Sequence, residues 1–115
     1  MPRYMFQANY TAAGAKGIVK EGGSARRAAI EKTIAGLEGR LEAFYFAFGD
    51  TDAFVIAELP DNASAAAVAF AVAQAGGATT KTSVLLTPEE ADQATRKTVQ
   101  YRPPDAINYE PYRPM

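Results

Sequence analysis

The stretch RLEAFYFAFGDTDAFVIAEL, residues 40–59, carries the pattern that decides the fold. Two runs rich in apolar and aromatic residues, 40–48 and 53–59, flank a short link that contains Gly49, Asp50 and Asp52. Glycine adopts positive φ without steric cost, and aspartate bonds its own backbone, so this link has the chemistry of a turn. The stretch therefore predicts two antiparallel strands joined as a β-hairpin.

Both faces of this hairpin are apolar. In the first strand, alternation places one set of side chains on one face, namely Leu41, Ala43, Tyr45 and Ala47, and the other set on the opposite face, namely Glu42, Phe44, Phe46 and Phe48. Helices can cover one face, but the other face would then be an exposed apolar patch. A patch of this size usually marks an interface. We expect a second copy of the chain to cover the other face around a twofold axis. The alternative is that the C-terminal helix or arm folds back over it.

The segments before the hairpin predict a strand, a connection and a helix. Residues 3–10 alternate as a strand, with Tyr4, Phe6, Ala8 and Tyr10 on one face. Residues 11–23 are rich in glycine and alanine, which favours a long connection with one helical turn around residues 16–20. Ser24 is the expected N-cap of a helix that Gly39 ends.

The segments after the hairpin predict a helix, a strand and a second helix. Residues 63–74 are alanine-rich and helical, with Asn62 or Ser64 as the cap and Gly76-Gly77 as the stop. Residues 79–86 form the fourth strand. Thr87, Pro88 and Glu90 have the spacing of a capping box, which opens a helix that runs to about Val99.

This order of elements, βαββαβ, predicts a ferredoxin-like α+β fold with a four-stranded antiparallel sheet. We expect one domain over residues 1–99, including the extra C-terminal helix. Residues 100–115 hold four of the seven prolines and three tyrosines, so we expect an extended arm there.

Composition excludes several classes of function. The chain has no cysteine and no histidine, so thiolate catalysis, Ser-His-Asp catalysis and His- or Cys-based metal and haem sites are impossible. We therefore expect no cofactor and no metal. A net charge of −1 with scattered basic residues gives no support for nucleic-acid binding. The absence of a signal peptide and of a long apolar run argues against a membrane and favours the cytoplasm.

The chain resembles the GYD family, a group of small bacterial proteins without an assigned activity. The resemblance rests on residues 41–49, 60–62 and 85–90, and it extends over about residues 3–97. The family motif places glycine, then tyrosine and aspartate, in the hairpin link; Gly49 and Asp52 match, and Thr51 replaces the tyrosine.

The family in turn resembles the dimeric α+β barrel proteins, whose sheets pair face to face, so the resemblance implies a homodimer. That wider group includes cofactor-free monooxygenases, haem enzymes and small-molecule binders, and a shared fold does not choose among them. The missing histidine removes the branches that depend on it.

Candidate site residues fall into three groups. Asp50 and Asp52 form a carboxylate pair for acid–base work or cation binding, or else a turn bonded to backbone amides. A polar minority among apolar strand positions is typical of a small-ligand site and consists of Gln7, Asn9, Tyr45, Glu58 and Lys81. Arg26, at a predicted helix start, is a candidate for anion binding.

We expect these residues to bind a small organic ligand in a cavity at the junction of the sheet and the dimer. One alternative is a cofactor-independent enzyme, such as a monooxygenase or isomerase, that uses Tyr45, Asp52 or Glu58 for proton transfer. The other alternative is a structural subunit of a homo-oligomer.

Overall fold

The computed structural model describes residues 1–105. The chain divides into two compact units, one spanning residues 1–85 and one beginning at Leu86, and each is described by itself. Most of the predicted arm, residues 106–115, lies outside the described residues, and the predicted domain boundary at residue 99 stays a prediction.

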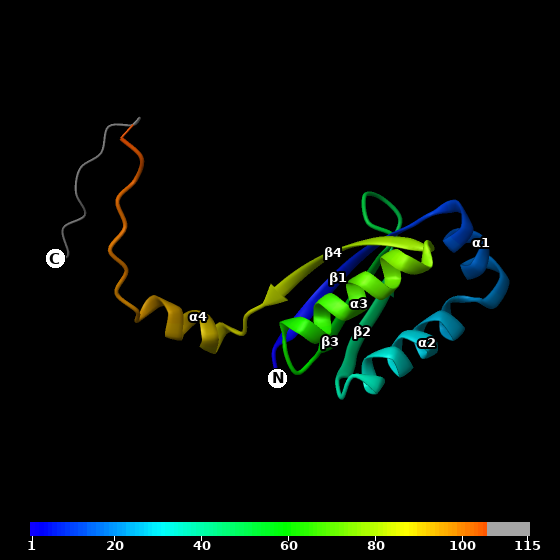
Figure 1. Ribbon diagram of the computed structural model, residues 1–115, viewed down its shortest axis with the longest axis horizontal. Coiled ribbons are helices and arrows are strands. Elements are labelled where there is room, and N and C mark those ends of the chain that lie inside the picture. Colours follow the sequence, from blue (N-terminus) through cyan, green and yellow to red (C-terminus); the bar gives the residue numbers. More distant parts are fainter. Residues whose placement is uncertain (106–115) are drawn as a thin grey trace. The chain divides into compact units, whose positions relative to one another are not determined.

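The first unit is built on a four-stranded antiparallel sheet (Figure 1). Its strands are β1 (Arg3–Tyr10), β2 (Arg40–Phe46), β3 (Ala53–Glu58) and β4 (Ala78–Leu85). They lie in the order β2-β3-β1-β4, so β1 pairs with β3 on one side and β4 on the other. This order confirms the predicted ferredoxin-like arrangement.

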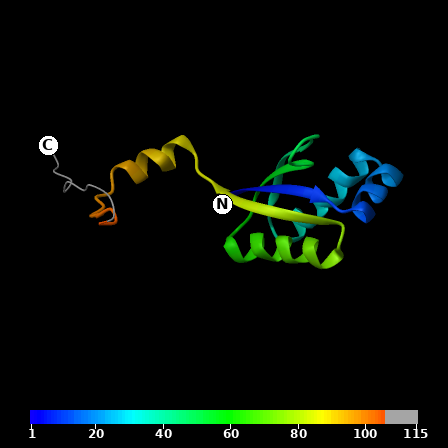
Figure 2. The same ribbon diagram turned by 90° about the horizontal axis from the view of Figure 1, so that it is seen from above.

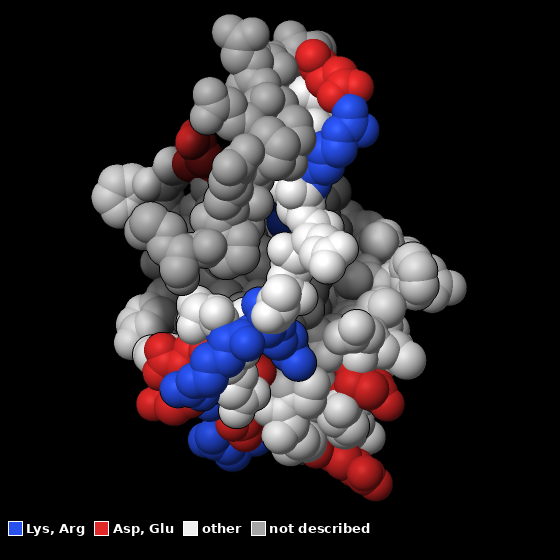
Figure 3. Space-filling view, turned by 90° about the vertical axis from the view of Figure 1, so that its left-hand side faces the viewer, with Lys and Arg blue, Asp and Glu red and all other residues white. Residues whose placement is uncertain are grey.

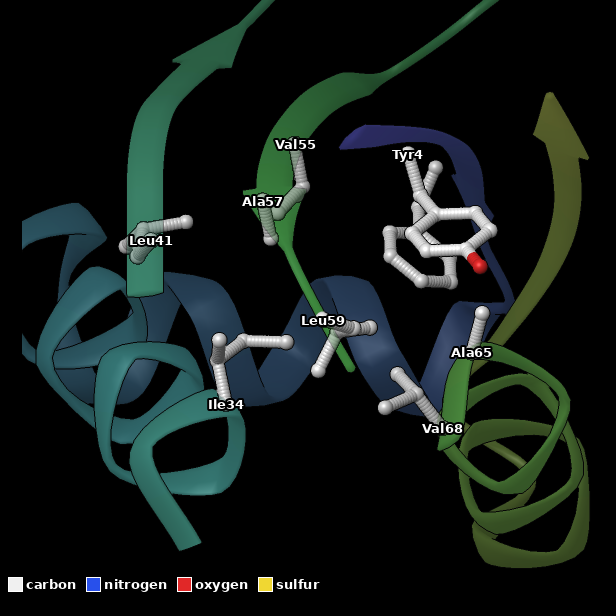
Figure 4. Close-up of a cluster of buried hydrophobic side chains, with 9 residues drawn as sticks. Tyr4, Ile34, Leu41, Val55, Ala57, Leu59, Ala65 and Val68 are labelled. Carbon is white, nitrogen blue, oxygen red and sulfur yellow. The ribbon is translucent and has the colours of Figure 1, made fainter. Parts of the chain in front are cut away.

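Three helices belong to this unit, and they are α1 (Ala12–Glu21), α2 (Gly23–Gly36) and α3 (Asn62–Ala75). Figures 1 and 2 both show α3 running alongside β4, against which it packs. Side chains of the sheet and of α2 and α3 point toward one another in Figure 4. The helices therefore cover one face of the sheet, here called the inner face; the opposite face is the outer face.

The core fills the space between the inner face and the helices. Its buried members are Tyr4, Phe6, Ile34, Leu41, Val55, Ala57, Leu59, Ala65 and Val68 (Figure 4). Alternate residues of β1 and β3 are buried along these strands, as period-two alternation predicts for the inner face. The phenol of Tyr4 donates a hydrogen bond to Asn62 Oδ1 at 2.6 Å, so this buried hydroxyl is satisfied.

Helix α1 replaces the predicted connection between residues 11 and 23. Thr11 caps it by accepting a hydrogen bond from the Gly14 amide at 3.2 Å. Gly22, with φ of 90°, separates α1 from α2 and is the N-cap of α2, so the prediction of Ser24 as the cap is wrong. Glycine reaches this conformation without strain, which lets two helices follow each other directly.

Helix α2 ends earlier than predicted. Its last residue is Gly36, and the chain reverses at Glu38, whose φ is +63°. Gly39 does not stop the helix. It lies so close to β3 that a Cβ there would overlap the Glu58 carbonyl oxygen and lie 2.7 Å from Leu59 Cδ2. The glycine is therefore required for packing.

Helix α3 begins at a different cap from those predicted. The side chain of Asp61, rather than Asn62 or Ser64, accepts the Ser64 amide at 2.8 Å. This hydrogen bond and a second from the Ser64 hydroxyl, also at 2.8 Å, hold the pKa of Asp61 below its ordinary value. At the other end, Gly76 takes the left-handed conformation with φ of 80°, which confirms the predicted stop.

A β-bulge in β2 changes the predicted faces. Leu41 pairs with Ala57 and Ala43 pairs with the adjacent Ile56, so Glu42 is the extra residue. Leu41 is consequently buried on the inner face with Phe44, and the prediction that it shares a face with Tyr45 is wrong. Strand β2 also ends at Phe46, two residues earlier than predicted.

The second unit contains helix α4 (Pro88–Thr95). The predicted capping box is confirmed: Thr87 Oγ1 accepts the Glu90 amide at 3.1 Å, and Glu90 Oε1 accepts the Thr87 amide at 3.0 Å. The helix ends at Thr95, four residues before the predicted end at Val99.

Candidate functional site

A cavity of about 310 Å³ lies between the inner face of the sheet and helices α1, α2 and α3. Strand β1 supplies Phe6, Ala8 and Tyr10 to its wall, because alternate residues of this strand face the helices. The cavity is partly open to the surface. It is a pocket within one chain, formed by residues of the first unit alone.

The wall of the cavity is mainly apolar. It includes Ile18 of α1, Ile30 of α2, and Val68 and Val72 of α3. Four lining residues have polar side chains, and they are Tyr10, Glu21, Arg26 and Thr80. An apolar concave site with a few polar groups is the usual form of a small-molecule site.

Arg26 carries the positive charge of the cavity wall. Its Nε lies 3.2 Å from Glu21 Oε1, close enough for an ion pair. The same Nε is buried and makes no hydrogen bond in the described structure, because its N–H is not aligned with the carboxylate oxygen. The contact between Arg26 and Glu21 is therefore an ion pair in which the Nε–H makes no hydrogen bond, because hydrogen bonds weaken steeply with misalignment.

Tyr10 brings the phenol of the cavity wall. Its backbone amide donates to Asp52 Oδ2 at 2.9 Å, and its ring lies 6.4 Å from that of Phe46. Burial raises the pKa of Tyr10, as do the charges of Asp52 and Glu21, while the charge of Arg26 opposes them. A phenol with a raised pKa is protonated at neutral pH and can donate a hydrogen bond.

Asp52 has an architectural role in this structure. Its backbone amide donates to the Ala8 carbonyl at 2.9 Å, and its carbonyl accepts the Ala47 amide at 2.8 Å. Together with the bond from its carboxylate to the Tyr10 amide, these contacts join the β2–β3 loop to the end of β1. These contacts support the interpretation of residues 49–52 as a turn. They also place Asp52 next to Tyr10, a residue of the cavity wall.

Most other predicted site residues lie on the outer face. Gln7 pairs with both Phe54 and Lys81, and Phe54 pairs with Tyr45, so these residues form one row across the sheet. Gln7 Oε1 accepts the hydroxyl of Thr51 at 3.3 Å, and Asn9 Oδ1 accepts the Asp52 amide at 3.2 Å. The structure thus divides the predicted residues: Arg26 lines the cavity, whereas the row that contains Tyr45 lies on the outer face.

Glu58 belongs to a cluster of two arginines and two glutamates at the end of the sheet near the N-terminus. Arg3 donates to both Glu42 Oε1 and Glu42 Oε2, at 2.7–2.9 Å, and to Glu58 Oε1 at 3.1 Å. Arg40 donates to Glu58 Oε2 at 3.2 Å. The hydrogen bonds from Arg3, opposed by burial, hold the pKa of Glu42 below its ordinary value.

This cluster predicts a loss of stability at acid pH. Because the pKa of Glu42 is lowered by folding, its contribution is complete above the ordinary carboxyl pKa and is lost as pH falls through the folded value. We expect Glu42→Gln to remove about 1 kcal/mol of this acid-dependent stability. Urea unfolding between pH 7 and pH 3 measures it, with Glu31→Gln on α2 as the control. If the free energy of unfolding falls with pH by the same amount in Glu42→Gln and the wild type, the prediction is wrong.

On the side shown in Figure 3, Lys and Arg side chains lie among Asp and Glu side chains. In residues 1–105 there is no group of three acidic side chains placed to hold a metal ion. Over the same residues, every helix is too short or too polar to cross a bilayer.

Of the four polar residues that line the cavity, sequence reasoning identified only Arg26 and missed Tyr10, Glu21 and Thr80. Tyr10 was placed on the same strand face as Tyr4, Phe6 and Ala8, and this shared face is the signal that could have found it. Glu21 gave no signal, because it belongs to α1, a segment predicted as a connection. Only the structure brings Glu21 and Arg26 together across the Gly22 junction.

Residues 4–95 match the family model of the GYD domain. No curated protein and no solved structure matches the chain.

Proposed function

The chain belongs to the GYD domain family, and we propose that it binds one small, largely apolar organic molecule in the cavity. The observation that supports this proposal is the pocket itself: about 310 Å³, enclosed by three helices and the sheet, and lined by aliphatic and aromatic side chains. Small-molecule pockets range from about 300 to 1,000 Å³, so the molecule is small.

The arrangement of polar groups favours binding over catalysis by proton transfer. Asp52 bonds the Tyr10 amide, and Glu58 is paired with Arg3 and Arg40, so neither carboxylate is free to act as a base. The Tyr10 phenol remains protonated because burial raises its pKa. Orientation of a ligand is the role that these groups support best. The cysteine-free composition suits a reducing compartment, and we place this binding protein in the cytoplasm.

The test of binding uses a filled cavity. Val72→Phe on α3 places a larger side chain in the wall, and Ala71→Phe adds the same ring to an exposed position of the same helix. Octan-1-ol and indole are titrated into each protein and followed by NMR. We expect one-to-one binding to the wild type and to Ala71→Phe, and a loss of tenfold or more in Val72→Phe.

A second filling variant guards against misfolding of the first. Gly17→Leu lies on α1, where a Cβ meets no atom within 4 Å, so the longer side chain has space in the wall. It should also weaken binding. Failure of both compounds to bind the wild type, or equal binding by all four proteins, would contradict the proposed function.

We also propose that the outer face is the interface of a homodimer. Pairing between strands places Met5 beside Ile56, and Tyr45 beside Phe54, on this face. Tyr45 is 69% exposed, and within residues 1–85 the helices pack against the opposite face. A twofold axis lets the same apolar patch meet its copy.

Oligomer mass tests this interface. Size-exclusion chromatography with light scattering should give a dimer for the wild type and a monomer for Ile56→Lys. Val19→Lys changes an exposed apolar residue of α1 and should leave the dimer intact. A monomeric wild type, or a dimer that survives Ile56→Lys, would refute a dimer formed through the outer face.

A further inference from the structure

We infer that the cavity selects an apolar monocarboxylate, whose carboxylate is held by Arg26 and Tyr10 while its apolar part fills the pocket. This inference rests on the proposed binding function and adds the chemistry of the ligand. Three observations carry it: an arginine of the cavity wall whose Nε makes no hydrogen bond, a second donor in the same wall, and an exposed carboxylate that competes for the arginine.

The first observation is the unsatisfied Nε of Arg26. Arg26 lines the cavity and its side chain is 34% exposed, while its buried Nε makes no hydrogen bond in the described structure, although Glu21 Oε1 lies 3.2 Å away. An arginine whose hydrogen bond to its carboxylate partner is unmade favours an incoming carboxylate that aligns better with its donors. A guanidinium presents its donors in a planar fork that matches a carboxylate.

The second observation is the position of Tyr10. It lines the same cavity, and the charge of Arg26 acts on its phenol, so the two groups lie within electrostatic reach of each other. A protonated phenol donates one hydrogen bond, and a carboxylate accepts several. A neutral alcohol can use one of these donors, whereas a carboxylate can use both and also neutralises the arginine.

The third observation is the state of Glu21. Its carboxylate is paired with Arg26 in this structure, and its side chain is 40% exposed. It can therefore turn into water when another carboxylate takes its place, at little cost in solvation. A ligand acid thus competes with Glu21, whereas a neutral ligand does not. This difference gives the inference a test in which removal of a side chain improves binding.

The size of the cavity limits the apolar part of the acid. A volume of about 310 Å³ corresponds to roughly ten water-sized groups. The wall offers the flat ring of Phe6 and the branched side chains of Ile30 and Val72. Medium-chain fatty acids and aryl-acetic acids have this size, and long-chain fatty acids exceed it.

The experiment compares octanoate with octan-1-ol by isothermal titration calorimetry, at pH 7.5 and below the concentration at which octanoate forms micelles. The proteins are the wild type, Arg26→Gln, Tyr10→Phe, Glu21→Gln and Arg27→Gln. Arg27 is the matched control, because it is the neighbouring arginine, pairs with Glu31 on the surface, and does not line the cavity.

We expect the wild type to bind octanoate at least tenfold more tightly than octan-1-ol. Arg26→Gln should weaken octanoate binding tenfold or more and affect octan-1-ol binding far less, and Tyr10→Phe should weaken octanoate binding about threefold. Glu21→Gln should strengthen octanoate binding severalfold, and Arg27→Gln should change neither ligand. Palmitate should bind more weakly than octanoate.

The outcomes separate this inference from the proposed function. If octan-1-ol binds in the cavity as well as octanoate does, or if Arg26→Gln and Glu21→Gln leave the octanoate affinity unchanged, the acid selectivity is wrong and the binding function stands. If neither compound binds the wild type, and the filled-cavity variants behave as the wild type does, both the inference and the proposed function are wrong.

Discussion

Replacement of Leu59 by alanine is expected to lower the free energy of unfolding by about 3 kcal/mol. Leu59 is fully buried and belongs to the core cluster between the sheet and helices α2 and α3. Its Cδ2 approaches the backbone at Gly39, and Ile34 lies against the same glycine, so the site is closely packed. Removal of the side chain therefore combines lost burial with a residual cavity.

The measurement is urea unfolding followed by far-ultraviolet circular dichroism. Leu86→Ala is the matched control, because Leu86 is 63% exposed and the same atoms are removed from a solvated position. We expect the control to change stability by less than about 0.5 kcal/mol. A cost at Leu59 as small as that of the control would show that this part of the core is loosely packed.

Replacement of Gly14 by alanine has the second-largest expected effect, a loss of about 2 kcal/mol. A Cβ at Gly14 would overlap the carbonyl oxygen of Gly77, which also accepts a hydrogen bond from the Thr11 amide at 3.0 Å. Thr11 Oγ1 donates to the Gly76 carbonyl at 2.8 Å, so the first turn of α1 is bonded to the α3–β4 turn. The new methyl group must push these two segments apart.

The matched control for this substitution is Gly36→Ala on α2, where a Cβ meets no atom within 4 Å. Alanine favours helix over glycine, so the control should keep or raise stability by up to about 1 kcal/mol. Because the displacement at Gly14 weakens the bonds that hold the first turn of α1, Gly14→Ala should also speed amide exchange in α1. If exchange in α1 and the unfolding midpoint both match the wild type, α1 does not depend on this contact.

The fold was predictable from the hairpin because its signals are local and strong. Turn residues between two runs of strand-forming residues define β2 and β3, and the capping box at Thr87 defines α4. Period-two alternation in residues 3–10 correctly separated Tyr4 and Phe6 from Met5 and Gln7. These patterns fix the element order, and the element order fixes the sheet order.

Helix α1 was missed because its composition argues against it. Gly14 and Gly17 each cost helix stability relative to alanine, and the helix has no buried residue. Its stability comes from the local cap at Thr11 and from tertiary contacts with Gly76 and Gly77. Glycine at position 14 is needed for that approach, so the residue that weakens the helix signal is the residue that lets the helix dock.

The candidate site was only partly predictable, because part of it belongs to α1, the helix that the sequence pattern did not reveal. Arg26 was selected because of its place at a helix start, yet its partner Glu21 belongs to α1, and the pair forms only when α1 and α2 meet at Gly22. The polar residues chosen on the strands were assigned to one cavity because alternation cannot tell which face the helices cover. The structure places Tyr45, Gln7 and Lys81 on the outer face.

The bulge at Glu42 lets β2 lose one residue more easily than β1 can. Leu41 and Ala43 already pair with adjacent residues of β3, so deletion of Glu42 restores regular alternation and turns no other side chain to the opposite face. Deletion within β1, which has neighbours on both sides, would invert half the strand. Position 42 is therefore the place in this sheet where chain length can change by one residue while the architecture is kept.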